Sequence, residues 1–185
     1  MIQFIGYVLA ITLEFLFAIT FTIYTIFLIY SNLKGSPYVP TRMKEIRYIL
    51  DEFPMNKNTF LMELGCGDGR FLREAAKRYQ VCGLGIDVNP LLLWKSRFFS
   101  RLAGLNTIEF RKEDLRNTSL GSADVLYLFL MPKLLDSLTP KFKKELKNGA
   151  IIISHGFKLT AFDPVRFKTI ERRPFPTYFY RFKRS

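Results

Sequence analysis

Three closely spaced glycines follow a short apolar segment and constrain the fold of this chain more than any other feature. Residues 60–64 have the composition of a buried β-strand and residues 70–79 have helical character, so the glycines fall in a strand-to-helix turn. Glycine there permits positive φ angles and close approach of a ligand to the backbone. A second apolar strand, residues 81–86, ends in Asp87, about 20 residues past the turn, where an acid can bind ribose hydroxyls. The pattern predicts an α/β fold with a nucleoside-binding site.

The acids around these glycines argue against a dinucleotide ligand. A dinucleotide fingerprint needs G-x-G-x-x-G and a helix N-terminus free for the pyrophosphate, whereas this chain has G-x-G-x-G with Glu63 and Asp68 beside it. Acids repel phosphate but suit a positively charged ligand without phosphate, and S-adenosylmethionine has both properties. Asp68 is also a favoured N-cap residue, a role compatible with ligand binding.

With these motifs, roughly residues 36–185 resemble the class I (seven-strand) S-adenosylmethionine-dependent methyltransferases. The glycine motif matches residues 63–69, the ribose acid matches Asp87, and an acid after the third strand, often near the adenine, matches Asp114. Turn chemistry is the alternative explanation for Asp114. The resemblance implies a Rossmann-like, doubly wound, mostly parallel seven-strand sheet that ends in an antiparallel hairpin.

A narrower resemblance rests on residues 37–41, Pro-Tyr-Val-Pro-Thr, and on Asn89-Pro90 and Phe129-Leu130-x-Pro132. These are similar to motifs of a small group of protein-lysine methyltransferases, which includes broad-specificity archaeal enzymes and membrane-anchored mitochondrial enzymes that modify the ATP synthase c subunit and the adenine nucleotide translocase. A linker with a helix cap is the alternative explanation for residues 37–41. Asp87 stands where the mitochondrial enzymes tend to have Glu, and the connection between the fifth strand and the hairpin is short, which leaves substrate selection open. The two resemblances together imply that the cofactor is bound by Pro40, Thr41, Glu63, Gly65, Cys66, Gly67, Asp68, Gly69, Asp87, Val88, Asn89, Asp114, Leu115 and Phe129.

The first 30 residues predict a membrane anchor. Residues 2–30 contain no Lys or Arg and one acid, Glu14, and a helix of this length reaches roughly 45 Å, enough to cross a bilayer. A cleaved signal peptide fits less well, because the basic start and a small-x-small cleavage site are missing and the apolar run is long. We expect a transmembrane helix over 1–30, a linker over 31–40 and one methyltransferase domain over 41–185. Basic residues that follow the span closely (Lys34, Arg42, Lys44 and Arg47) predict a single-pass protein with a cytoplasmic domain.

The chain is basic, with 28 Lys+Arg against 16 Asp+Glu and a formal net charge of +12. Such a charge indicates an anionic neighbour, and the anchor makes the membrane lipid surface at least as good a candidate as nucleic acid. Solubility alone is the simpler explanation. The cysteines, Cys66 and Cys82, are expected at opposite ends of neighbouring strands and hence as free thiols. We expect no metal site.

The remaining segments predict alternating strands and helices that build a parallel sheet with helices on both faces. Thr41 is expected to cap the first of these helices, and Pro90 is well placed at the first turn of the third. His155, after a core strand, is interpreted as a hydrogen-bonded structural residue. The predicted helices are 41–53, 70–79, 91–102 and 132–146, and the later strands are 106–111, 123–129, 150–154 and a hairpin of 166–172 with 177–183.

Methyl transfer from a sulfonium needs alignment and exclusion of water rather than a covalent nucleophile, so we name no catalytic residue. Nucleic-acid amino methyltransferases carry Asn/Asp-Pro-Pro-aromatic after the fourth strand, where this chain has Leu-Phe-Leu-Met-Pro at 128–132. We therefore expect a lysine of a membrane-associated protein as acceptor, with Phe129 and Tyr38 as candidates for cation–π contact with the amine. The alternatives are a small molecule or lipid headgroup as acceptor, or a catalytically silent domain that binds membrane or RNA.

Overall fold

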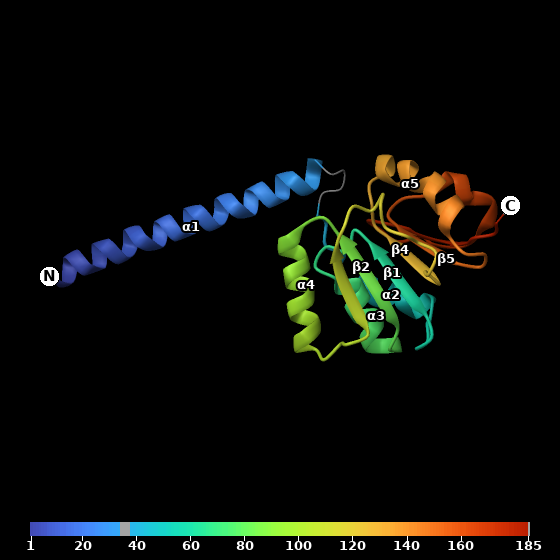
Figure 1. Ribbon diagram of the computed structural model, residues 1–185, viewed down its shortest axis with the longest axis horizontal. Coiled ribbons are helices and arrows are strands. Elements are labelled where there is room, and N and C mark those ends of the chain that lie inside the picture. The colour runs from blue at the N-terminus through green and yellow to red at the C-terminus, as the bar shows by residue number, and fades with distance from the viewer. Residues whose placement is uncertain (34–37, 185) are drawn as a thin grey trace.

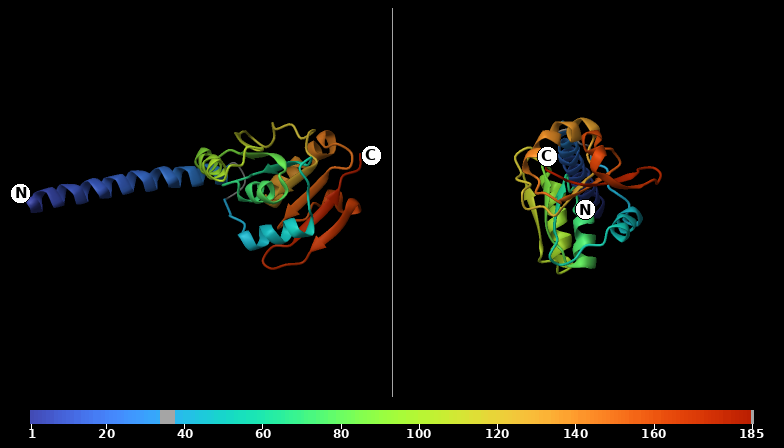
Figure 2. Two further views of the ribbon diagram at one scale, coloured as in Figure 1. Left: turned by 90° about the horizontal axis from the view of Figure 1, so that it is seen from below. Right: turned by 90° about the vertical axis from the view of Figure 1, so that its right-hand side faces the viewer.

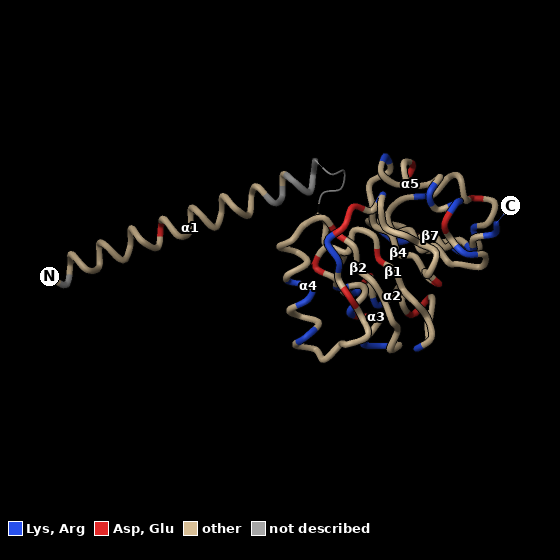
Figure 3. The backbone as a smooth tube through the Cα atoms, in the orientation of Figure 1, with Lys and Arg blue, Asp and Glu red and all other residues tan. Residues whose placement is uncertain are grey.

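A long N-terminal helix, α1, projects from an α/β body that holds all other elements (Figure 1). The computed structural model describes residues 1–33 and 38–184. Helix α1 spans Ile2–Leu33, and its segment Gln3–Ile26 is long and apolar enough to cross a membrane. The left view of Figure 2 shows α1 pointing away from the body, and in Figure 3 the charged residues gather on the body. The sequence of α1 carries the acid Glu14 and no Lys or Arg. The helix includes residues 2–30 of the predicted anchor and the first three residues of the predicted linker, whereas residues 34–37 of that linker lie outside the described residues.

The body is built on a seven-strand sheet in the order β3-β2-β1-β4-β5-β7-β6. Neighbours from β3 to β5 are parallel, and β7 runs antiparallel to both β5 and β6. This arrangement is the predicted mostly parallel sheet with a closing hairpin. The strand bounds are β1 Phe60–Leu64, β2 Cys82–Asp87, β3 Ile108–Lys112, β4 Val125–Leu128, β5 Ile151–His155, β6 Arg166–Ile170 and β7 Thr177–Arg181. The strand order changes direction between β1 and β4, and ligands of open α/β sheets bind at the carboxyl ends of the strands beside such a point.

Two hydrophobic cores form on the two faces of the sheet. One face is covered by α2 (Met43–Glu52), α3 (Arg70–Tyr79) and α4 (Pro90–Leu102), and the other by α5 (Pro132–Glu145) and the 3-10 helix η1 (Thr160–Val165). Strand β4 alternates between them, because Tyr127 belongs to the first core and Leu126 and Leu128 to the second. Its four residues are all buried, as expected for a strand with helices on both sides.

Most predicted boundaries agree with the structure to within two residues. Helix α4 begins at Pro90 because the Asn89 side chain accepts hydrogen bonds from the backbone N–H groups of Leu91 and Leu92 at 3.0 and 3.3 Å. The prediction that Thr41 caps α2 is wrong, since Arg42 occupies the N-cap position without a side-chain bond. The sequence reasoning also missed η1.

Both cysteines are free thiols, as predicted. Cys66 is buried directly after β1, whereas Cys82 is exposed at the start of β2, at the opposite end of the sheet. Because strands β1 and β2 are parallel neighbours, their opposite ends are too far apart for a disulfide.

Candidate functional site

The glycine turn between β1 and α3 is fixed to the end of β2 by backbone hydrogen bonds. The N–H groups of Gly65 and Cys66 both donate to the carbonyl of Ile86, at 2.8 and 2.9 Å. Gly67 has a φ of +53°, and a Cβ built on it would lie 2.8 Å from Cε2 of Tyr38. Glycine is therefore required at 67 both for the backbone conformation and for the close approach of the Tyr38 ring.

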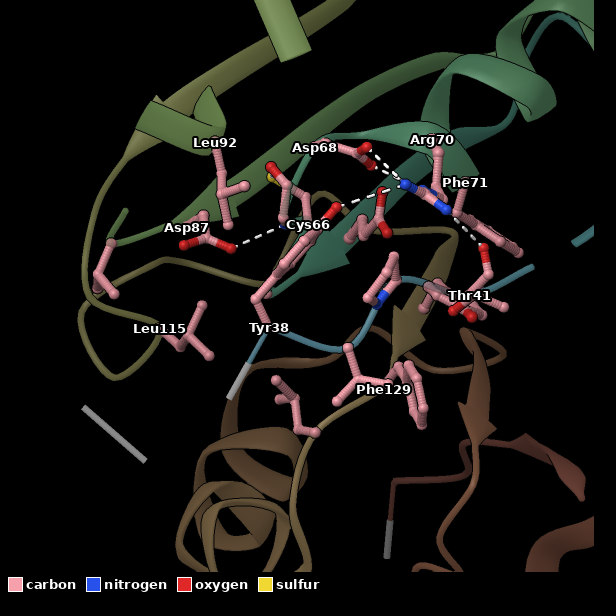
Figure 4. Close-up of a pocket in the computed structure, with 18 of the residues that line it drawn as sticks. Tyr38, Thr41, Cys66, Asp68, Arg70, Phe71, Asp87, Leu92, Leu115 and Phe129 are labelled. Carbon is pink, nitrogen blue, oxygen red and sulfur yellow. Dashed lines mark hydrogen bonds and ion pairs between the residues drawn. The ribbon is translucent and has the colours of Figure 1, made fainter. Parts of the chain in front are cut away.

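Asp87 ends β2 with its carboxylate turned toward this turn (Figure 4). One oxygen accepts the N–H of Gly67 and the other accepts the N–H of Asn89, both at 2.8 Å. Burial raises the pKa of Asp87, and these backbone bonds act in the opposite direction. The same carboxylate thus orders the glycine turn and faces the space in front of it.

Arg70, at the start of α3, links the turn to the segment that enters the body. Its guanidinium makes two bonds to the Asp68 carboxylate, at 2.7 and 2.8 Å, and donates to the Thr41 carbonyl at 3.0 Å and the Tyr38 hydroxyl at 3.4 Å. Asp68 is consequently an ion-pair partner and does not cap α3, whose N-cap residue is Gly69. Burial alone would raise the pKa of Asp68, but Arg70 and the nearby Lys95 lower it to about 2.

Glu63 is a buried acid of the site. It is the fourth residue of strand β1 and 5% exposed, and one of its oxygens accepts the N–H of Leu72 at 3.2 Å. Burial raises its pKa well above the usual range. Burial and the charge of Asp68 also raise the pKa of Tyr38, to about 12, so the tyrosine hydroxyl is neutral at physiological pH.

These groups line a cavity with about 870 Å³ of open space at the carboxyl ends of β1, β2 and β4 (Figure 4). It brings together twelve of the fourteen predicted residues, namely Pro40, Thr41, Glu63, Gly65, Cys66, Gly67, Asp68, Asp87, Val88, Asp114, Leu115 and Phe129. The other two support the site from behind: Gly69 packs against Phe110, and Asn89 caps α4. The sequence reasoning did not predict Arg70, Phe71, Leu92, Arg116, Tyr127, Leu130 and Leu134, which also line this cavity.

Some of these missed residues carried a usable signal. Arg70 directly follows the glycine motif, and Leu92 lies one turn into the helix after Asp87, so both were bound to lie near the turn. Tyr127 belongs to β4, whose residues are all buried, and its ring stacks on Phe71 at 3.5 Å between centroids. No local pattern tells which residue of such a strand faces a cavity.

A second cavity, with about 550 Å³ of open space, adjoins the first. The two share Val39, Pro40, Thr41 and Phe129. Beyond these shared residues the second cavity is lined by His155, Pro174 and Phe175, and by Arg42 and Glu45 at the start of α2. The rings of Phe129, His155 and Phe175 form a cluster with centroid distances of 4.7, 5.2 and 5.9 Å.

His155 is held in this cluster by one ring nitrogen. Its Nδ1 lies 2.8 Å from the hydroxyl oxygen of Thr177 on β7, and the residue is 2% exposed. Burial lowers the pKa of His155 to about 4, so the ring is neutral at pH 7. The interpretation of His155 as a hydrogen-bonded residue agrees with this geometry, but the sequence did not indicate that it lines a cavity.

The chemistry of the first cavity suits a cationic, hydroxyl-bearing ligand. Three carboxyl groups, Glu63, Asp68 and Asp87, converge from β1, the turn and β2. The two basic residues that line it, Arg70 and Arg116, are each paired with an acid. Among the described residues, no lining group is therefore available as a free cation for phosphate, while the carboxylates can accept hydrogen bonds from hydroxyl and ammonium groups.

Comparison with known proteins is consistent with this chemistry. The model of the ANTKMT methyltransferase domain matches residues 63–166. A protein-lysine N-methyltransferase of Saccharolobus islandicus is 31% identical over 142 residues, which cover 73% of this chain and 85% of that protein. The adenine nucleotide translocase lysine N-methyltransferase of Mus musculus is 30% identical over 70% of this chain, and the match spans 56% of the mouse protein. Among solved structures, an RNA methyltransferase from Salinibacter ruber in complex with S-adenosyl-L-homocysteine has a TM-score of 0.75 at 28% identity and covers 80% of this chain and 95% of its own.

Proposed function

This chain belongs to the ANTKMT methyltransferase domain family, and from that premise we propose that it is a membrane-anchored S-adenosylmethionine-dependent methyltransferase whose acceptor is a lysine of a membrane-associated protein. The observation that carries the proposal is the pair of adjoining cavities, of which the first is acidic and the second aromatic. A methyl donor in the first cavity and an amine in the second would meet where the two cavities adjoin, beside the lining residues that they share. Such an arrangement is what a direct displacement requires.

The first cavity supplies the groups that bind the cofactor. S-adenosylmethionine, when bound, supplies a methyl group activated by its sulfonium. Asp87 accepts hydrogen bonds from ribose hydroxyls, because its oxygens already face the cavity from the end of β2. Glu63 and Asp68 favour the cationic part of the ligand, and Leu92 and Leu115 provide apolar contact for the base. We propose that the other predicted residues that line the cavity also contact the cofactor.

The second cavity supplies the environment that a lysine acceptor needs. A lysine amine must lose its proton before it can attack the methyl group, and at a pKa of about 10.4 only about one in 2,500 is neutral at pH 7. Burial among Phe129, Phe175 and the neutral His155 lowers the pKa of an entering amine, because desolvation disfavours its charged form. The same rings hold the amine and its methylated product by cation–π contact. No described group is assigned as a general base.

The membrane location in the proposal rests on α1 and on charge. Gln3–Ile26 has the length and hydropathy of a span, and the basic residues that follow it favour a cytoplasmic body by the positive-inside rule. The mouse relative is named for its action on the adenine nucleotide translocase. By analogy, we propose that the acceptor lysine of this enzyme belongs to a protein held at or in the same bilayer.

RNA is the second candidate acceptor. The net charge of +12 and the similarity to the Salinibacter ruber protein favour it. Against it stands the segment after β4, Phe129 to Pro132, which lacks the Asn/Asp-Pro-Pro-aromatic motif of nucleic-acid amino methyltransferases. The described residues that line the second cavity, beside its aromatic cluster of Phe129, His155 and Phe175, also include no Asn or Gln side chain that could read the edge of a flipped base.

The test is labelling of native membranes with tritiated S-adenosylmethionine and the full-length enzyme. We expect the label in protein and, after acid hydrolysis, in methylated lysine. Label that is extracted with lipid or released by ribonuclease would reject the lysine acceptor, and cofactor binding without any transfer would identify a silent domain. At a cofactor concentration below Kd, Asp87→Asn should reduce the labelling at least about tenfold, whereas the matched control Glu109→Gln, a change of an exposed acid on β3, should leave it unchanged.

A further inference from the structure

Helix α4 exposes a stripe of large apolar side chains. Leu91, Trp94, Phe98 and Leu102 follow one another at spacings of three, four and four residues and are 37%, 63%, 50% and 74% exposed. Residues three or four apart lie on the same side of a helix. The opposite side of α4, with Leu93, Ser96 and Ser100, is buried against the body. An apolar face of this size on a folded domain marks a binding surface.

The composition of this face is that of an interfacial membrane helix. Trp94 and Phe98 stack with ring centroids 5.6 Å apart, and Phe99 meets Phe98 edge-on at 5.4 Å. The helix also carries Lys95, Arg97 and Arg101 and has no acidic residue. Helices that lie in the plane of a bilayer interface combine Trp, Phe and Leu on one side with Lys and Arg beside them, and aromatic residues favour the headgroup level.

The position of α4 also fits a lipid bilayer as its partner. In Figure 1 and in the left view of Figure 2, α4 lies on the side of the body from which α1 projects. Figure 1 also shows α4 running crosswise to α1, at the edge of the body, with the sheet on the side away from α1. If α1 crosses a bilayer, α4 then lies along its surface and turns its exposed stripe toward the lipid.

We propose that the outer face of α4 docks on an anionic phospholipid bilayer. The stripe of Leu91, Trp94, Phe98 and Leu102 enters the boundary between headgroups and acyl chains, and Arg101 in the last turn of the helix binds lipid phosphate. Lys95 pairs with Asp68 at 3.4 Å and Arg97 donates to the Phe110 carbonyl, so these two add positive charge near the surface while they hold the helix to the body. The proposal rests on the anchoring in the proposed function. It adds an orientation to that anchoring: Leu92 of the same helix lines the cofactor cavity, so docking holds this cavity next to the membrane surface.

The experiment uses Trp94, the only tryptophan of the chain, as the probe. Full-length enzyme is reconstituted into phosphatidylcholine–phosphatidylglycerol vesicles, and its emission is compared between lipids with and without bromine on the upper acyl chain. A docked indole lies roughly 5–10 Å into the interface, so we expect bromine to remove more than about half of the emission. Phe98→Glu with Leu102→Glu should restore it. The control Phe167→Glu, which changes a 48% exposed aromatic residue on the edge strand β6, should have no effect.

Vesicle flotation separates this proposal from the anchoring on which it rests. Protein that floats with the vesicles while Trp94 stays unquenched overturns the docking surface and leaves the anchor standing. Protein that does not float overturns both. Quenching that added RNA relieves would assign the face to nucleic acid, and quenching that falls as the protein-to-lipid ratio rises would assign it to a second copy of the chain; either result overturns lipid docking. The wild-type measurement needs no variant, so a misfolded variant cannot obscure the result.

Discussion

The replacement Asp87→Asn tests the cofactor site most directly. The Asp87 carboxylate accepts two backbone N–H groups, those of Gly67 and Asn89, and an amide of the same shape has only one oxygen to offer them. One buried N–H would then face an NH₂ group, which costs about 1–3 kcal/mol of folding stability. For a body of about 150 residues each kcal/mol corresponds to a fall of about 2–4 °C in Tm.

Asp87→Asn should also weaken cofactor binding, in addition to its effect on folding stability. A hydrogen bond to a charged group contributes about 1.5–3 kcal/mol, so losing the carboxylate that accepts a ribose hydroxyl should raise Kd about 10- to 150-fold. Isothermal titration calorimetry with S-adenosylmethionine measures this change, and thermal unfolding measures the stability. Asp87→Glu keeps the charge and should retain much of the affinity. An unchanged Kd in a folded Asn variant would refute the assignment of Asp87 to the ribose.

Three further predictions concern the turn, the second cavity and the anchor. Gly67→Ala should weaken cofactor binding as well as stability, because its Cβ would lie 2.8 Å from Tyr38. Gly104 has a similar φ of +66° but open space around it, so Gly104→Ala should reduce the free energy of unfolding only by the backbone strain of about 1–2 kcal/mol and should leave cofactor binding unchanged. Burial depresses the pKa of His155 in the folded state to about 4, so its contribution to stability is complete above pH 6.5 and is lost as the pH falls toward about 4. The raised pKa of Glu63 gives stability the opposite dependence on pH. Urea unfolding of wild type and His155→Gln at stepped pH separates the two, because the difference between the proteins contains only the effect of His155. Removing residues 1–34 should leave activity on soluble peptides similar but reduce methylation of a native membrane substrate at least roughly tenfold, and equal labelling by both forms in the same vesicles would contradict the tethering.

The sequence predicted the fold well because the relevant signals are local. Strand β1 is apolar over its whole length apart from Glu63 and is followed at once by glycines, so its position and its neighbours could be inferred from a few residues. One expectation near the site was wrong, because Thr41 has a strong capping propensity but Arg42 occupies the N-cap position of α2. The Asp68 carboxylate, for which a cap of α3 was the alternative role, pairs with Arg70 two residues further along the chain.

The second cavity was not predictable for the opposite reason. Its aromatic cluster joins Phe129 after β4, His155 at the end of β5 and Phe175 before β7, which are separated by 20 or more residues in the chain. Only the order of the strands, with β7 inserted beside β5, brings these rings together. The exposure of Trp94 and Phe98 could not be predicted either, because an apolar residue on a helix next to a sheet is expected to lie in the hydrophobic core.

Chain length alone restricts where an acceptor can meet this site. Helix α1 ends at Leu33, and Tyr38 already packs against the glycine turn of the cofactor cavity. Five residue steps span at most about 18 Å when fully extended. If α1 spans a bilayer as proposed, with Gln3–Ile26 in the membrane, the cavity wall is held close to the lipid surface and cannot reach lysines far from it. The proposed anchoring would then set the choice of substrate largely by distance from the membrane surface, and a docked α4 would narrow that choice further by fixing which side of the body faces the lipid.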